Sequence, residues 1–133
     1  MKPNYLKLIN VAKKAAKNAY APYSKFKVGA AALGGSGNIY SGANIENASY
    51  GLTVCAERVA IFKAVSEGEK TVKAVAVVWS AKGFATPCGA CRQVIAEFAK
   101  NADIIISSED GKHKIMKLPR LLPDSFSLKN KQQ

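Results

Sequence analysis

The stretch that decides the fold class is residues 72–79, Val-Lys-Ala-Val-Ala-Val-Val-Trp. Every residue in it except Lys73 is apolar. A short apolar run without polar alternation is typical of a strand that is buried on both faces. The sequence therefore predicts a central strand that is covered on each side.

Strands and helices alternate along the chain around this segment. Apolar spacing and turn residues predict further strands at residues 28–33, 39–42, 103–107 and 113–117. Helices are predicted at residues 4–20, 55–67 and 88–100, with a short helical turn between Pro119 and Pro123. This order of elements predicts an α/β sandwich around a mostly buried sheet.

The glycine-rich segment at residues 34–38, Gly-Gly-Ser-Gly-Asn, separates the first two predicted strands. A phosphate-binding loop would end in Lys-Ser or Lys-Thr and lead into a helix. This segment has no such ending and leads into a strand, so it is interpreted as a hairpin turn.

The size and composition of the chain fit one ordinary globular domain. The 133 residues have a mass of 14.2 kDa, with 48% hydrophobic and 22% charged residues, which excludes a disordered tail, a collagen or a simple coiled coil. We expect a single domain over residues 1–133, in which residues 127–133 form a frayed polar tail. No apolar run approaches the ~20 residues of a membrane helix, and the lysine-rich N-terminus does not resemble a signal peptide. These features predict a cytoplasmic protein without a membrane partner.

The basic surplus of the chain lies at its two ends. The formal net charge is +11, with seven lysines and no acid in residues 1–45 and six basic residues and one acid in residues 112–133. Lysine can neutralise nucleic-acid phosphates whatever their sequence. The lysines lack interleaved aromatic clusters and a known nucleic-acid motif, so a solvated basic surface is the preferred interpretation. A nucleic-acid partner stays open.

The chain has three cysteines, Cys55, Cys88 and Cys91, and each cluster lies where a helix is predicted to begin. An odd number argues against a disulfide framework. Unpaired N–H groups at a helix start stabilise thiolates. Catalytic zinc takes three protein ligands and leaves one position for water, so three cysteines suit an open zinc site. His113, the only histidine, could instead complete a closed structural site, although an ordinary strand histidine is the preferred interpretation.

Glu57 lies two residues after Cys55, in the first turn of the same predicted helix. Taken alone, it is a helix-start acid that the helix dipole favours. Beside an open zinc site, however, a carboxylate can take a proton from water and return it to a leaving group. Zinc deaminases combine three sulfur or histidine ligands with such a glutamate and a later Pro-Cys-x-x-Cys.

Five segments together resemble the small, three-cysteine, homotetrameric cytidine deaminases. They are residues 21–30 (APYSKFKVGA), 44–48 (NIENA), 55–58 (CAER), 87–93 (PCGACRQ) and 121–126 (LLPDSF). The resemblance implies a three-layer α/β/α sandwich with a central mixed five-stranded sheet. It implies hydrolytic deamination of free cytidine and 2′-deoxycytidine in pyrimidine salvage, with one Zn²⁺ per chain.

The same resemblance assigns roles to individual residues. Cys55, Cys88 and Cys91 would bind zinc, and Glu57 would carry the proton. The implied substrate-binding residues are Asn44 and Glu46 at the ribose 3′-hydroxyl, Phe26 on the pyrimidine, the backbone near Ala56 and Thr86 at the amino group, and Phe126 reaching into a neighbouring subunit. An amide donor and a carboxylate acceptor suit a hydroxyl that both donates and accepts.

Charge balance gives a reason for a nearby arginine. Three thiolates on Zn²⁺ leave a charge of about −1, which weakens the metal as a Lewis acid. Arg58 and Arg92 follow Glu57 and Cys91 directly. We expect one of these arginines to donate hydrogen bonds to the cysteine sulfurs, and Arg58 is the preferred candidate.

Alternative functions share parts of this pattern. Deaminases of cytosine in RNA or DNA use the same zinc chemistry, and the charge favours them. A deaminase of a nucleoside antibiotic such as blasticidin S would share the fold. A non-catalytic zinc or thiol module, or a redox pair of Cys88 and Cys91, would not need Glu57, Asn44 and Glu46. Trp79, Phe84 and His113 receive no role from the sequence.

Overall fold

The five predicted strands form one mixed sheet in the computed structural model, which describes residues 2–80, 84 and 86–128. The strands are β1 (Val28–Gly34), β2 (Ile39–Ala43), β3 (Val72–Trp79), β4 (Asp103–Ser107) and β5 (His113–Lys117). Their order is β2-β1-β3-β4-β5, with β3 and β4 parallel and the other neighbours antiparallel. The apolar run at residues 72–79 forms the central strand β3, as predicted.

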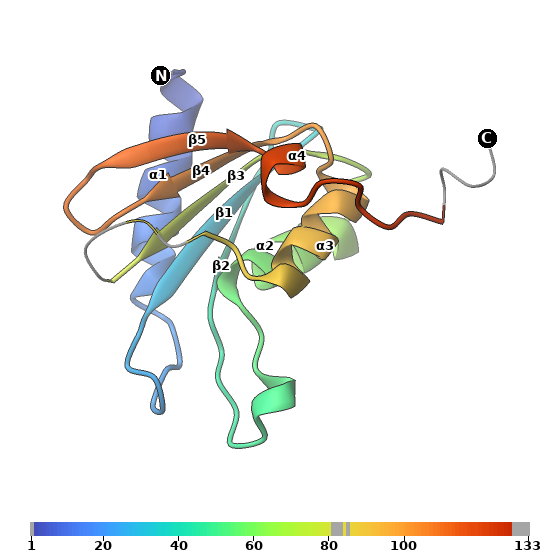
Figure 1. The fold of residues 1–133 in the computed structure, drawn as a ribbon. Coiled ribbons are helices and arrows are strands. Elements are labelled where there is room, and N and C mark those ends of the chain that lie inside the picture. The colour runs from blue at the N-terminus through green and yellow to red at the C-terminus, as the bar shows by residue number, and fades with distance from the viewer. Residues whose placement is uncertain (1, 81–83, 85, 129–133) are drawn as a thin grey trace.

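Helices cover both faces of the sheet and make it the middle of three layers (Figure 1). The helices are α1 (Pro3–Ala16), α2 (Ala56–Ser66), α3 (Gly89–Phe98), the short α4 (Leu118–Leu121) and a 3₁₀ turn, η1 (Tyr50–Leu52). One face of the sheet carries α1, and the opposite face carries α2 and α3. The predicted three-layer α/β/α sandwich is confirmed.

Alternation along β3 explains why this strand is apolar throughout. Ala74 and Ala76 pack with Leu8 of α1. Val75 and Val77 point the other way and pack with Ile61 of α2. Successive side chains of a strand point to opposite faces, so a strand between two helix layers needs apolar residues at nearly every position.

Two glycines let helices approach the sheet closely. A Cβ atom on Gly42 of β2 would lie 2.6 Å from the Ala60 nitrogen and 2.7 Å from the Ala56 oxygen, both in α2. A Cβ atom on Gly29 of β1 would lie 1.8 Å from the Ala12 oxygen of α1. Because no larger residue fits at these positions, the first turn of α2 is held directly against the sheet.

The first helix ends earlier than the sequence predicts. It was expected to reach residue 20 but stops at Ala16. The Tyr20 N–H donates to the Asn44 oxygen at 2.9 Å, and the Tyr20 oxygen accepts from the Glu46 N–H at 2.8 Å. This long-range backbone pairing competes with the helix and draws the chain toward the segment after β2.

No described helix has the length and apolar character needed to cross a membrane.

Candidate metal centre and active-site cavity

The three cysteines converge at the starts of two neighbouring helices. Cys55 is the N-cap residue of α2, Cys88 is the N-cap residue of α3, and Cys91 lies in the first turn of α3. Their sulfur atoms all lie within 4.8 Å of one another. The prediction that both cysteine clusters begin helices is confirmed, and the fold joins residues that are 33 positions apart.

The spacing of the sulfurs suits one tetrahedral zinc ion. The Cys55 and Cys88 sulfurs are 3.8 Å apart, and the Cys88 and Cys91 sulfurs are 3.4 Å apart. Zinc–sulfur bonds of ~2.3 Å in a tetrahedron place two sulfurs about 3.8 Å apart. Within the described residues, these cysteines form the one group of three or more potential metal ligands. His113 starts the edge strand β5 opposite Ser107 and is not part of this group.

Hydrogen bonds within the cluster place negative charge on one sulfur when no metal is bound. The bond with Cys91, together with the Arg58 guanidinium and Cys88, lowers the pKa of Cys55 to about 5 against the effect of burial. The bond to Cys55 and burial raise the pKa of Cys91. A metal ion takes the place of the remaining protons, because zinc binds the thiolate form.

Glu57 is buried beside this cluster in the first turn of α2. Its side chain is 5% exposed, and it lines the same cavity as Cys55 and Cys88. Burial, assisted by the negative charge of Cys55, raises the pKa of Glu57 to about 7. A carboxyl group with this pKa can both accept and release a proton near neutral pH.

A cavity of about 280 Å³ leads to these groups and brings together most of the predicted site residues. Its lining includes Phe26, Asn44, Glu46, Cys55, Ala56, Glu57, Thr86 and Cys88, and further Ser24, Val28, Thr53, Val77 and Trp79. The volume is close to the lower end for small-molecule sites. A second hollow of about 360 Å³ adjoins it and shares Ser24, Glu46 and Thr53. That hollow is not lined by the cysteines or Glu57, so the smaller cavity is the candidate active site.

Asn44 and Glu46 also organise the chain around Phe26. The Asn44 side-chain oxygen accepts from the Val28 N–H at 2.8 Å, and its nitrogen donates to the Phe26 oxygen at 2.9 Å. The Glu46 carboxylate accepts from the Tyr23 and Ser24 N–H groups at 3.0 and 3.1 Å and from the Ser24 hydroxyl. An amide and a carboxylate can each form further bonds, so their contact with a sugar stays a prediction.

Trp79 is a cavity residue that the sequence analysis did not place. Its ring stacks on Phe26 with centroids 5.4 Å apart and an interplanar angle of 28°. Trp79 lies two residues beyond Val77, so both side chains point to the same face of β3. The two-residue period of the strand was the signal that could have found it. Phe84 is 45% exposed and is not among the residues that line this cavity.

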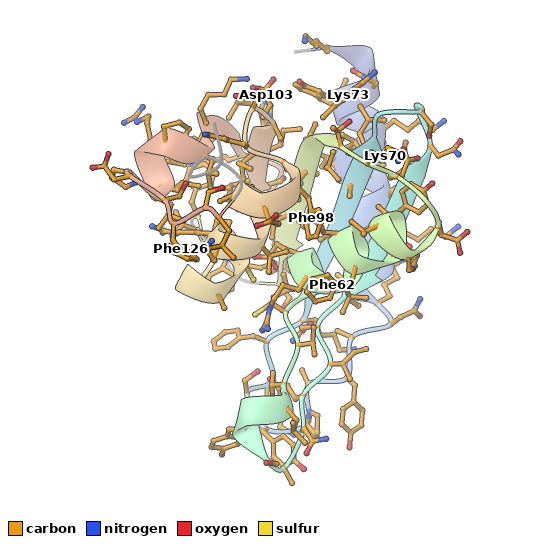
Figure 2. All side chains as sticks on the ribbon, turned by 90° about the vertical axis from the view of Figure 1, so that its right-hand side faces the viewer. Phe62, Lys70, Lys73, Phe98, Asp103 and Phe126 are labelled. Carbon is orange, nitrogen blue, oxygen red and sulfur yellow. The ribbon has the colours of Figure 1, made fainter. Side chains whose placement is uncertain are left out.

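Phe126 does not line the cavity of its own chain. Its side chain is 60% exposed, and its backbone oxygen accepts from the Gln93 side chain at 3.1 Å. Figure 2 shows Phe126 at the outer side of the helix layer, while Phe62 lies on α2. Its predicted role in a neighbouring subunit stays a prediction.

The two candidate arginines have different partners. The Arg58 Nη2 atom donates to the Cys55 sulfur at 3.5 Å and to the Thr53 oxygen at 3.4 Å. Arg92 donates instead to the Pro87 oxygen, the Leu121 oxygen and the Thr86 hydroxyl. Arg58 is therefore the arginine that contacts a cysteine sulfur, as preferred from the sequence.

We expect Arg58→Ala to weaken zinc binding about 10- to 100-fold, the range found for lost partners of metal ligands. Without the guanidinium, the pKa of Cys55 rises from about 5, so protons compete better with zinc. On acidification, the variant should release zinc at a higher pH than the wild type. A chelator assay across pH measures this, with the exposed Arg120→Ala as control. An unchanged release profile would show that Arg58 does not support the sulfur ligands.

The geometry defines the class of the protein. Three sulfurs at tetrahedral spacing, with no fourth protein ligand among the described residues, lie next to a buried carboxyl group with a pKa near neutrality. These are the features of a zinc-dependent hydrolase.

Comparisons with known proteins identify the family within this class. The zinc-binding region of cytidine and deoxycytidylate deaminases matches residues 3–108. A cytidine deaminase from Sporosarcina psychrophila is 52% identical over 122 residues, which cover 91% of this chain and 90% of the relative. The crystal structure of a cytidine deaminase from Burkholderia pseudomallei superposes with a TM-score of 0.88 at 43% identity, covering 95% of this chain and 100% of the other. That of the Mycobacterium tuberculosis enzyme gives 0.81 at 38% identity, covering 96% and 100%. The chain belongs to the cytidine and deoxycytidylate deaminase family.

Proposed function

We propose that the protein removes the amino group of free cytidine and 2′-deoxycytidine by hydrolysis of the C4–N bond, giving uridine or 2′-deoxyuridine and ammonia. The observation that carries the proposal is a single small cavity lined by Glu57, two cysteines of the metal group, Asn44 and Glu46. Proton-transfer chemistry and sugar-binding groups thus occupy one site. The family to which the chain belongs supports this reaction. We propose that the reaction serves pyrimidine salvage.

The cysteines and Glu57 have different proposed roles: the cysteines bind the metal ion, and Glu57 transfers protons. Cys55, Cys88 and Cys91 would hold the ion, which would supply a water molecule acidic enough to react at neutral pH. Glu57 would take a proton from that water and pass it to the ring nitrogen N3 as the water oxygen bonds to C4. It would then take the proton of the new C4 hydroxyl group and pass it to the amino group, which leaves as ammonia when the C4–N bond breaks. Its buried position and its pKa of about 7 support this shuttle.

The cavity walls orient the base and the sugar. Phe26 and Trp79 offer an aromatic wall for the pyrimidine. Ala56 and Thr86 line the cavity, and the backbone near them is proposed to bond the exocyclic amino group. Asn44 and Glu46 bind the ribose hydroxyls. Their hydrogen bonds to the backbone of Phe26 and Ser24 also hold the sugar-binding groups in a fixed position relative to the aromatic wall.

The function is tested by one pair of measurements on purified protein. Metal analysis should give one zinc per chain, and ammonia release should be observed with cytidine and deoxycytidine. Ammonia release from a cytosine-containing oligonucleotide, with none from the free nucleosides, would contradict the proposal and favour a nucleic-acid deaminase.

We expect the fluorescence of Trp79 to report nucleoside binding. Trp79 is the only tryptophan of the chain, and it lines the cavity against Phe26. Saturation with the product uridine should therefore change its emission, with a midpoint that matches the inhibition constant of uridine. Free N-acetyltryptophanamide corrects for light absorbed by the nucleoside. Unchanged emission at inhibitory uridine concentrations would contradict the placement of the nucleoside beside Trp79.

We also propose a homotetramer in which Phe126 of one chain completes a neighbouring site. The resemblance of residues 121–126 to the homotetrameric cytidine deaminases supports this, and the Phe126 side chain is 60% exposed within its own chain. Reduced thiol ligands suit the reducing cytoplasm, which is the proposed compartment.

Complementation tests the shared site. Coexpressed Glu57→Gln and Phe126→Ala chains form mixed assemblies in which about a quarter of sites combine an intact Glu57 with an intact neighbouring Phe126. Activity should then rise above that of either variant alone. Activity equal to the average of the two separate variants would show that Phe126 does not act between chains.

A further inference from the structure

Arg92 connects two segments that are distant in sequence. Its side chain extends from the first turns of α3 and donates three hydrogen bonds in different directions. Nε donates to the Pro87 oxygen at 2.7 Å, Nη2 to the Thr86 hydroxyl at 3.0 Å, and Nη1 to the Leu121 oxygen at 2.6 Å. A planar guanidinium with five N–H donors can serve three acceptors at once, whereas a lysine ammonium cannot match this geometry.

Two of these acceptors belong to the chain that enters the metal site. Pro87 is buried and directly precedes Cys88, the N-cap residue of α3. Thr86 lines the cavity together with Cys88 and Glu57. The position of this short segment therefore decides both where one sulfur lies and where part of the cavity wall lies.

The third acceptor belongs to the C-terminal segment. Leu121 is the last residue of α4, and the last carbonyl groups of a helix have no partner within it. The next residue of α3, Gln93, donates from its side chain to the Phe126 oxygen at 3.1 Å. Adjacent residues of one helical turn thus hold the C-terminal segment at two points, five residues apart.

We propose that Arg92 is a positioning residue that ties the segment of Thr86, Pro87 and Cys88 to the C-terminal segment that carries Phe126. Its three side-chain hydrogen bonds go to oxygen atoms rather than to a sulfur: the Thr86 hydroxyl and the backbone oxygens of Pro87 and Leu121. The metal site and the segment that presents Phe126 then move together, because both are bonded to one rigid guanidinium.

The apolar core around α4 does not depend on this arginine. Leu118 is 1% exposed and Leu121 is 7% exposed, and both belong to the core shared with α2 and α3. Removing the guanidinium leaves that packing in place while it frees two carbonyl groups and the Thr86 hydroxyl. The expected effect is therefore local and confined to the two tied segments.

Zinc release and hydrogen exchange test the connection without relying on turnover. In Arg92→Ala, zinc transfer to a chromogenic chelator should be about tenfold faster than in the wild type. Amide exchange should rise in peptides from residues 118–128 and remain unchanged in β3 and β4. Guanidinium ion at concentrations far below denaturation should slow zinc release again in this variant and leave the wild type unaffected.

Three further variants separate the parts of the proposal. Arg92→Lys should release zinc faster than the wild type, because one ammonium cannot replace the three bonds. Gln93→Ala should raise exchange near Phe126 and keep the wild-type rate of zinc release. Arg120→Ala, an exposed arginine of α4, should match the wild type in both measurements.

Either of two results would overturn the proposal. One is a wild-type rate of zinc release in Arg92→Ala together with unchanged exchange at residues 118–128. The other is increased exchange throughout β3 and β4, which would make Arg92 a general stabilising residue. Inactivity of the wild type on cytidine would count against the proposed function and leave both readouts intact.

Discussion

Replacing Glu57 by glutamine is expected to lower kcat for cytidine by at least about 10³-fold while one zinc per chain is retained. Glutamine has nearly the same shape, so the cavity and the three sulfurs keep their places. It cannot accept and release a proton, however, and proton transfer by a positioned side chain is worth about 10²- to 10⁴-fold. Steady-state ammonia release and metal analysis of the same sample measure the two effects.

The stability of the metal-free variant provides a check on its folding. Burial raises the pKa of Glu57 from 4.5 to about 7, so the folded chain binds this proton more tightly than the unfolded chain. Ionising the buried carboxyl group therefore reduces wild-type stability as pH rises above 4.5, by roughly 3 kcal/mol once pH exceeds 7. Glutamine carries no charge, so the variant should become more stable than the wild type over this range.

A control on the same helix distinguishes the loss of a negative charge on α2 from the loss of proton transfer. Glu67→Gln removes an exposed carboxylate at the other end of α2 and should leave kcat unchanged. If Glu57→Gln kept zinc and also kept wild-type turnover, Glu57 would not be the proton shuttle.

Replacing Cys91 by serine is expected to reduce bound zinc from one to below about one-tenth per chain and to lower activity by more than about 10³-fold. Cys91 is fully buried in the first turn of α3, with its sulfur within 4.8 Å of the other two, so no outside group can take its place. A hydroxyl group is a much poorer zinc ligand than a thiolate, and the two remaining sulfurs hold the ion weakly. Metal analysis after dialysis against a chelator measures the loss.

His113 supplies the matched control. It is the only histidine of the chain, and it lies on the edge strand β5, away from the cysteine group. His113→Ala should therefore retain one zinc and full activity. Loss of zinc in this variant would contradict a three-sulfur site with an open fourth position. Full zinc content in Cys91→Ser would contradict the assignment of Cys91 as a ligand.

Local patterns predicted the elements of the fold accurately where each element depends on its own residues. The apolar run at residues 72–79 forms β3 with the predicted bounds, because a run with a single polar residue, the exposed Lys73, favours a strand that is buried on both faces. The first helix was predicted too long because its end depends on pairing between Tyr20 and the segment at Asn44 and Glu46. A helix end that is set by pairing with a distant segment leaves little signal in the helix itself.

The candidate site shows the same division at the level of side chains. The sequence identified both cysteine clusters and Glu57, since a helix start is a local feature. It favoured Arg58 over Arg92 as the partner of the sulfurs but did not exclude Arg92, because both follow a site residue directly. The fold directs Arg58 to the Cys55 sulfur and Arg92 to Pro87 and Leu121.

By itself, the amino-acid sequence determined the strands, the helix starts and the kinds of ligand that this protein offers a metal ion. Those properties follow from hydrophobic period, turn residues and thiol chemistry, which act over a few neighbouring positions. Only the tertiary structure decided that Cys55 meets Cys88, that Trp79 stacks on Phe26, and that Asn44 and Glu46 bond the chain around the cavity. These contacts join segments far apart in sequence, and their geometry exists only once the sheet and its helices have packed together.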